Sequence, residues 1–166
     1  MQPKTAKQVF DFFPGIWKIA RHVTAKISKQ NAIAYGYGLF TASEINPNLV
    51  VYSEKVAIHY LQSNTTHIGK QQYQYLYDTA EASLSKHLHN GNLLYKLNLL
   101  NGQIDGEHVC MQDSYLSNYI FETHRFRIIY TVDGPLKCYR ITSIYTSMAG
   151  KTLTDLGITI ANGVIV

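Results

Sequence analysis

The sequence has few charges, few prolines and only two cysteines, and each shortage excludes a class of protein. Charged residues make up 16% of the 166 residues and hydrophobic ones 46%, a balance that allows a buried core and argues against disorder. Four prolines exclude collagen-like and proline-rich chains. Cys110 and Cys138 match no zinc-binding spacing, and no stretch has the ~18–20 consecutive apolar residues of a transmembrane helix.

Neither an export signal nor a strongly basic surface is evident. Residues 1–13 lack the long apolar run and the small-residue cleavage site of a secretory signal, so we expect a cytoplasmic protein with reduced thiols. The net charge is +4. A solvated strand face explains the basic cluster better than contact with phosphate does, so no nucleic-acid partner is expected. The residues of this cluster are Lys18, Arg21, His22, Lys26 and Lys29.

Only the first segment has a helical pattern. Thr5 and Gln8 have the spacing of a capping box, and Pro14 ends the segment. The apolar residues that share one helical face are Ala6, Val9, Phe10 and Phe13. The pattern predicts a short helix over about residues 5–13, with one apolar face to bury.

From Gly15 onward, apolar residues alternate with a period of two, as in strands. Thirteen tyrosines and six phenylalanines also favour strands. Asn-Gly or Asp-Gly pairs, which suit hairpin turns, stand at residues 90–91, 101–102, 105–106 and 133–134. Gly36 and Gly38 fall within a strand pattern, where glycine marks a bend or bulge.

We therefore predict one all-β domain over residues 1–166. An antiparallel up-and-down barrel of about nine or ten strands occupies residues 15–146, and the N-terminal helix covers one of its ends. Residues 147–166 form a C-terminal extension, with an extra hairpin around Asn162 and Gly163.

Four motifs carry a resemblance to a known family. They are Phe-Pro-Gly-Ile-Trp at 13–17, Tyr-Ser-Glu at 52–54, His-Val-Cys-Met-Gln-Asp-Ser-Tyr at 108–115 and Gly-Pro-Leu-Lys-Cys-Tyr at 134–139. Gly15-Ile16-Trp17 resembles the glycine-x-tryptophan signature of lipocalin-type barrels. Over roughly residues 12–146 the chain is similar to an uncharacterised bacterial family of calycin-like barrels, related in shape to lipocalins and fatty-acid-binding proteins. The resemblance implies a barrel with a ligand cavity and brings no established reaction.

The resemblance also implies a structural role for Trp17. In such barrels this tryptophan packs at one end beneath a basic residue from the last strand. Here Thr146 follows the last tyrosine, where the family tends to have arginine, and Phe126 and Ile128 stand where it tends to have tryptophan. We therefore expect Arg140 to lie over the Trp17 ring in a cation–π contact.

Glu54 interrupts an otherwise apolar strand face. It has the parity of Val50, Tyr52, Val56 and Ile58, and an unpaired buried carboxylate is costly. Three interpretations stay open. Glu54 anchors a polar group of a ligand, serves as a general base, or makes a structural hydrogen bond to a tyrosine or an arginine across the barrel. A position at the barrel rim would also explain it.

Tyrosines form the densest aromatic stripes. Tyr73, Tyr75 and Tyr77 project to one side of a strand at ~7 Å intervals, where they would stack on a flat ligand or simply pack. Tyr115 shares its parity with Tyr119, and Lys137 with Tyr139. Lys137 would then reach an acidic ligand or remain a surface charge near the barrel mouth.

The histidines offer weaker candidates. His108 and Cys110 share a strand face and form either a nucleophile pair or, more simply, part of a cavity wall. His87 and His89 are half of a metal site at most, so no metal site is predicted. No cofactor is predicted; haem, bound through His59, His108 or His124, is a minor alternative.

The preferred function is the binding of a small hydrophobic or aromatic molecule in the barrel lumen. A cyclase or isomerase that uses Glu54 or His108 to move a proton is the alternative, and a haem barrel is a further one. A homo-oligomer is left open. The expected ligand-binding residues are Glu54, Tyr73, Tyr75, Tyr77, His108, Tyr115, Lys137 and Tyr139.

Overall fold

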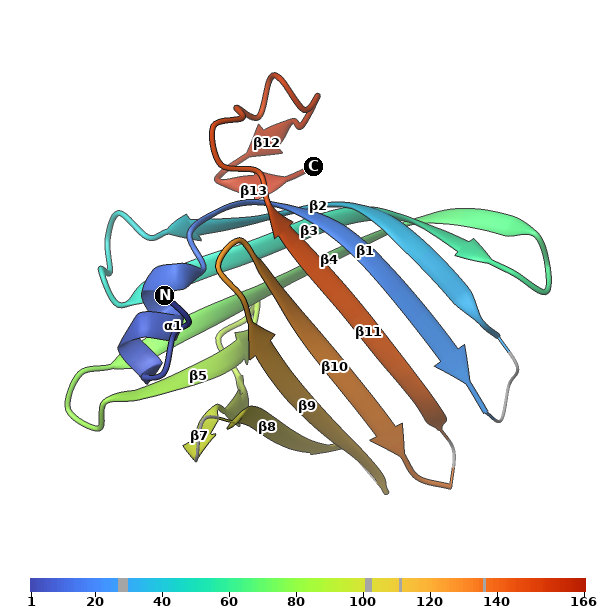
Figure 1. Cartoon of the computed structure of the whole chain (residues 1–166), viewed down its shortest axis with the longest axis horizontal. Coiled ribbons are helices and arrows are strands. Elements are labelled where there is room, and N and C mark those ends of the chain that lie inside the picture. Colours follow the sequence, from blue (N-terminus) through green and yellow to red (C-terminus); the bar gives the residue numbers. More distant parts are fainter. Residues whose placement is uncertain (27–29, 101–102, 111, 136) are drawn as a thin grey trace.

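The computed structural model describes residues 1–26, 30–100, 103–110, 112–135 and 137–166. Helix α1 (Ala6–Phe12) begins with the predicted capping box: the Thr5 hydroxyl accepts a hydrogen bond from the Gln8 amide, and the Gln8 side chain accepts one from the Thr5 amide. The apolar face of α1 is buried. Figure 1 shows α1 lying across one end of the sheet, so the predicted helix and its capping role at the barrel end are confirmed.

Strands dominate the rest of the chain. The strands of the main sheet are β1 (Gly15–Ala25), β2 (Ala32–Ala42), β3 (Leu49–Tyr60), β4 (Thr65–Asp78), β5 (Ser83–Leu88), β6 (Leu93–Lys96), β7 (Asn98–Leu100), β8 (Gln103–Cys110), β9 (Asp113–Phe121), β10 (Arg125–Asp133) and β11 (Cys138–Ser147). A separate two-stranded hairpin consists of β12 (Ile160–Ala161) and β13 (Val164–Ile165).

The main sheet curls into a nearly closed antiparallel barrel. Strands that follow each other in sequence pair with each other, except β6 and β7, and β1 also pairs with β11, so that Trp17 lies opposite Ser147. The open seam lies between β6 and β7, which are the two edges of the sheet. The predicted all-β barrel is thus confirmed.

The sheet has eleven strands because one stretch changes partner at Leu97. Residues before Leu97 pair with β5, and residues after it pair with β8. The Leu97 amide still donates to the Leu84 carbonyl at 2.8 Å, and the Leu97 side chain is buried. The division into β6 and β7 at Leu97 contributes to a sheet of eleven strands, where about nine or ten were predicted.

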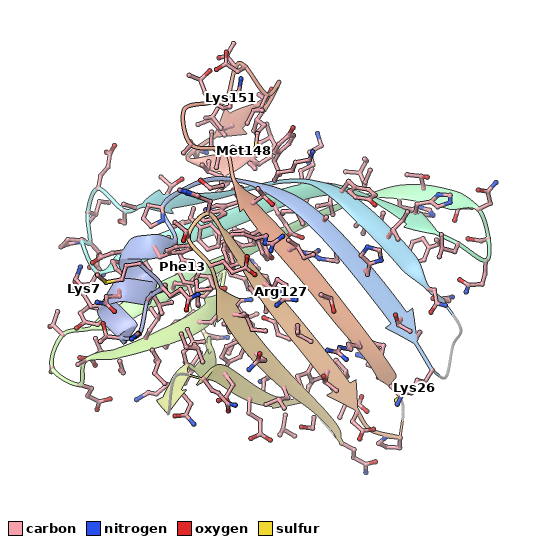
Figure 2. The ribbon with its side chains drawn as sticks, viewed as in Figure 1. Lys7, Phe13, Lys26, Arg127, Met148 and Lys151 are labelled. Atoms are coloured by element: carbon pink, nitrogen blue, oxygen red, sulfur yellow. The ribbon has the colours of Figure 1, made fainter. Side chains whose placement is uncertain are left out.

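Aromatic rings fill the end of the barrel beneath α1. The Phe13 ring stacks on Phe40 with centroids 4.8 Å apart, and Phe126 stacks on Tyr145 at 4.3 Å. The indole nitrogen of Trp17 donates to the Phe13 carbonyl at 2.8 Å. In Figure 2, Phe13 marks this end, and Lys26, at the end of β1, marks the opposite one.

The expected contact between Arg140 and Trp17 is wrong. Trp17 lies opposite Ser147, whereas Arg140 lies opposite Thr24, toward the other end of β1 and β11. The Trp17 ring is instead flanked by Phe12 and Phe126, with centroids 5.5 and 4.8 Å away. Arg140 itself is exposed to solvent.

Some of the predicted turns are present and one is not. Gly91 has a φ of 89° in the turn after β5, and residues 133–135 lie where β10 ends. The predicted turn at residues 105–106 is wrong, because Gly106 lies within β8, opposite Ser117. The turn at residues 101–102 lies outside the described residues, as do Lys29, Met111 and Leu136.

The C-terminal hairpin forms where it was predicted. Asn162 and Gly163 have φ angles of 51° and 77°, the left-handed conformation that a two-residue hairpin turn requires. The Ile165 side chain is buried, and its amide donates to the Ser53 hydroxyl at 3.0 Å, so the hairpin covers part of the outer face of β3. Within the described part of the chain, no helix has both the length and the apolar character needed to span a membrane.

Candidate functional site

A cavity of about 320 Å³ lies inside the barrel. Its wall is mainly aromatic and carries a few polar groups. The tyrosines that line it are Tyr52, Tyr73, Tyr75, Tyr95, Tyr115, Tyr130, Tyr139 and Tyr145. The other polar groups on the wall include Arg21, Gln71, Lys86, His108 and Ser143.

A buried ion pair forms one part of the wall. Arg21 Nη1 and Nη2 each donate to one carboxylate oxygen of Glu54, both at 2.7 Å, and Arg21 Nε donates to the Ser143 hydroxyl at 2.7 Å. The Tyr52 hydroxyl also donates to Glu54. Glu54 is only 1% exposed, and its charge is compensated by a two-point contact of the strongest kind.

The electrostatics of this pair follow from its burial. Burial by itself would lower the pKa of Arg21, but the hydrogen bonds and the charge of Glu54, with the nearby Tyr145, raise it on balance. The guanidinium therefore stays charged. Burial raises the pKa of Tyr52 well above its ordinary value, and the neighbouring Tyr145 and Glu54 raise it further. Tyr52 is thus a neutral donor to the carboxylate.

Lys86 forms the second part of the wall. Its side chain points into the barrel from β5 and is only 4% exposed. Lys86 Nζ lies 3.9 Å from the centre of the Tyr73 ring and is hydrogen-bonded to the Tyr130 hydroxyl at 2.8 Å. Within the described part of the chain it forms no ion pair. Burial lowers the pKa of Lys86 to about 7; Glu54 opposes this effect and Arg21 adds to it.

A chain of tyrosine hydroxyls continues from Lys86. The hydroxyl of Tyr130 lies 2.7 Å from that of Tyr95, which lies 2.6 Å from that of Tyr119. The Tyr119 hydroxyl lies 3.4 Å from that of Tyr75. Burial raises the pKa of each of these tyrosines, so all of them stay protonated at neutral pH.

The predicted lining is brought together in part. The residues that lie on the cavity wall as predicted are Tyr73, Tyr75, His108, Tyr115 and Tyr139. Three predicted lining residues lie elsewhere. Glu54 sits behind the wall, engaged by Arg21 and Tyr52, so the structural hydrogen bond named as one alternative is the geometry observed.

Tyr77 and Lys137 are the other two. Tyr77 lies on β4 near the covered end and packs against Phe10 of α1, with centroids 5.9 Å apart. Lys137 is exposed outside the cavity and donates to the Tyr115 hydroxyl at 3.1 Å. The strand parity was correct for Tyr77, but parity does not tell how far along the barrel axis a residue lies.

Of the histidines considered as haem ligands, His108 lies on the wall, with its ring 5.9 Å from that of Tyr115. His59 lies on the outer face of β3 against Thr66, and His124 is exposed between β9 and β10. His87 is held by Ser85 and the Gly91 carbonyl. Among the residues described, no cluster of three or more histidine, cysteine or acidic side chains could hold a metal.

Sequence reasoning missed two charged groups of the wall. Arg21 was assigned to an external basic cluster, although it has the parity of Trp17 and Ile19, which face inward. Lys86 has the parity of Leu84, so it interrupts an apolar face just as Glu54 does. The same signal that singled out Glu54 would have found both.

The comparisons with known proteins agree with the extent of the barrel. None of the curated proteins matches this chain. One family model does match, that of a family of unknown function, DUF6314, and the match covers residues 13–147, from Phe13 beneath α1 to the last residue of β11. The chain is therefore a member of the DUF6314 family.

Proposed function

We propose that this protein binds a small hydrophobic or aromatic molecule inside its barrel. The observation that supports the proposal is the cavity of about 320 Å³ with its aromatic wall and few polar groups. Ligand sites typically enclose ~300–1,000 Å³ and combine apolar walls with a small number of polar groups that orient the ligand. The cavity is at the lower limit of this range, which favours a ligand of one or two fused rings.

The wall suits a flat ligand. Tyr73 and Tyr75 contribute rings to the wall from β4, and Tyr95 and Tyr130 contribute rings from β6 and β10. Tyrosine offers aromatic contact together with a hydroxyl for hydrogen bonding, so such a wall favours aromatic molecules that carry one polar group. Affinity would come mainly from the exclusion of water from apolar surfaces.

The proposed entrance is the end away from α1. Phe13 and Trp17 are buried beneath the helix and close that end. At the other end, His108, Tyr115 and Tyr139 of the wall are partly exposed, and Cys110 is exposed. A ligand would enter past these residues and reach Lys86 deeper in the barrel.

The proposal is tested with 2-naphthylmethanol, a flat probe with one hydroxyl, in a calorimetric titration. Ile141→Trp fills part of the cavity from β11 and should weaken binding at least about tenfold, which corresponds to ~1.4 kcal/mol. Ile144→Trp makes the same change on the outward side of the same strand and should bind as the parent does. Absence of binding to the parent protein, or equal losses in both variants, would contradict a lumen site.

The alternative of a cyclase or isomerase has less support. Both carboxylate oxygens of Glu54 are engaged by Arg21, which leaves no free oxygen facing the cavity to move a proton. His108 would then have to act alone. The two cysteines are free, which suits the reducing cytoplasm that we propose as the location.

A further inference from the structure

We propose that Lys86 forms a reversible imine with an aldehyde or ketone ligand in the cavity. The inference rests on the proposed function and deepens it, because it names a reactive group for the ligand and a covalent attachment point in the protein. Nucleophilic lysines typically lie in desolvated pockets, where the amine reacts with carbonyl carbons.

The first support is the placement of the amine. Lys86 is the one buried lysine of the described chain, and its Nζ lies on the wall of the cavity among the rings of Tyr73, Tyr75, Tyr95 and Tyr130. Glu54, the carboxylate whose charge acts on it, is already bound on both oxygens by Arg21. The amine therefore has no counterion of its own.

The second support is a count of hydroxyl protons. Four tyrosines, Tyr75, Tyr119, Tyr95 and Tyr130, form a line of contacts that ends at Lys86. If the amine is neutral, each hydroxyl of the line can donate to the next group and Tyr130 can donate to the lone pair of Lys86 Nζ, so every hydroxyl proton of the line has an acceptor. If the amine is charged, the line reverses and the proton of Tyr75, a residue only 1% exposed, loses its partner in the chain. Because unpaired buried donors are costly, the network favours the neutral, nucleophilic amine.

The electrostatic surroundings agree with this count. The rings that surround the Lys86 amine from β4, β6 and β10 belong to tyrosines whose own pKa values are raised by burial, so these tyrosines are not ionised near neutral pH. Arg21 and Glu54 act from β1 and β3 as a nearly compensated pair. Burial lowers the pKa of Lys86 to about 7, so a large share of the amine is neutral at physiological pH.

The chemistry balances without any oxidant or reductant. The Lys86 nitrogen attacks the carbonyl carbon, a C–N bond forms, and a proton passes from nitrogen to oxygen to give a carbinolamine. The hydroxyl then leaves as water while the C=N bond forms. Tyr130, 2.8 Å from Nζ, is placed to donate a proton to the departing oxygen and to recover one from the nitrogen. Addition of water reverses the reaction and releases the ligand.

Three probes of equal shape separate this proposal from its rivals. They are 2-naphthaldehyde, 2-naphthylmethanol and 2-naphthoate. The full-length protein is incubated with the aldehyde and sodium cyanoborohydride, and peptide mapping by mass spectrometry locates the trapped amine. Lys86 should be modified at least about tenfold faster than any exposed lysine, since each unit of pKa lowering raises the neutral fraction about tenfold.

Controls use both variants and competition. Lys86→Met and Lys86→Arg should lose the fast modification, whereas Lys70→Met, which removes an exposed lysine of β4, should retain it. In the parent protein, excess 2-naphthylmethanol should slow the trapping of Lys86. This competition experiment does not depend on whether any variant folds. Even labelling of all lysines, or an unmodified Lys86, would overturn the proposal.

Two outcomes distinguish failure of this inference from failure of the proposed function. If 2-naphthylmethanol binds but Lys86 is not trapped by the aldehyde, the lumen binds ligands and the imine is wrong. If 2-naphthoate binds much more tightly than the alcohol, and only when Lys86 is present, while the aldehyde is not trapped, Lys86 recognises acids instead. If none of the three probes binds, both proposals fail together.

Discussion

Arg21 and Glu54 face each other inside the barrel across the intervening strand β2, joined by two hydrogen bonds of 2.7 Å each. The pair ties β1 to β3 and, through Ser143, to β11. It lies beside the closure between the first and last long strands, where β1 pairs with β11. Its integrity therefore bears on the closed shape of the barrel as well as on the charge of the cavity.

Glu54→Gln should destabilise the protein by ~3–5 kcal/mol, because it leaves the Arg21 guanidinium buried without its counter-charge. Urea unfolding followed by circular dichroism measures the change in the free energy of unfolding. The double variant Arg21→Met with Glu54→Gln should lose less than the sum of the two single losses. Additive losses, or a single-variant loss below about 0.5 kcal/mol, would contradict the pairing.

The free energy of unfolding should rise with pH between about pH 7 and pH 10.5, where Lys86 is neutral in the folded state and still protonated in the unfolded state. An unfolded lysine keeps its proton up to a pKa near 10.5, whereas folded Lys86 loses its proton near pH 7. The unfolded state therefore binds more protons between these values, and the free energy of unfolding gains up to about 1.4 kcal/mol per pH unit. Below about pH 7 both states are protonated and this contribution levels off.

The Lys86→Met variant isolates the contribution of Lys86. From about pH 6 to pH 9.5 the free energy of unfolding of the parent, measured relative to that of the variant, should rise with pH, because the other titrating groups cancel in the difference. Above about pH 10 the tyrosines reverse the trend, because their folded pKa values are raised and the unfolded phenols ionise first. Parallel curves for the two proteins would show that Lys86 titrates normally.

Gly106→Ala should cost about 1–3 kcal/mol and weaken binding of 2-naphthylmethanol. A Cβ at this position would meet the ring of Tyr95, which lies against β8 from β6 at the open seam of the barrel. Tyr95 would be displaced from the cavity wall and from its contact with Tyr119. Asp105→Ala, at the adjacent and half-buried position of β8, is the control and should leave binding unchanged.

Trp17 and Arg140 should behave independently. Trp17→Phe removes the donor to the Phe13 carbonyl and should cost about 1–3 kcal/mol in thermal or chemical unfolding. Arg140→Ala changes an exposed side chain and should stay within about 0.5 kcal/mol of the parent. A large loss of stability in Arg140→Ala, or non-additive losses in the double variant, would indicate that Trp17 and Arg140 interact after all.

Period-two alternation was sufficient to predict the barrel, because one face of each strand must be buried and the turns between strands have a distinctive composition. The signal was weakest where the chain changes partner without a turn. Leu97 is buried and fits the strand pattern, so no turn residue in the local sequence indicates that β6 ends there and β7 begins. At Gly106 a turn was predicted where there is none. An Asp-Gly pair usually marks a turn, but this glycine lies within β8 and makes room for the Tyr95 ring.

Strand parity predicted which tyrosines face inward but not what they meet there. Tyr73 and Tyr77 share a face, yet Tyr73 lines the cavity and Tyr77 packs under α1, because depth along the barrel depends on register with strands distant in sequence. Arg140 was placed over Trp17 for want of the same information. The pairing of Trp17 with Ser147 is a long-range fact that no local pattern contains.

Closure through β1 and β11 also has a consequence for folding kinetics. The two strands that complete the sheet come from opposite ends of the matched family region, so their hydrogen bonds form only after nearly all of that chain has been brought together. Such non-local pairing costs loop-closure entropy before any contact between the two strands stabilises the chain. All-β topologies of this kind typically fold on the millisecond-to-second scale. We therefore expect slow refolding in which the β1–β11 junction forms late, so that variants of this junction change the unfolding rate more than the refolding rate.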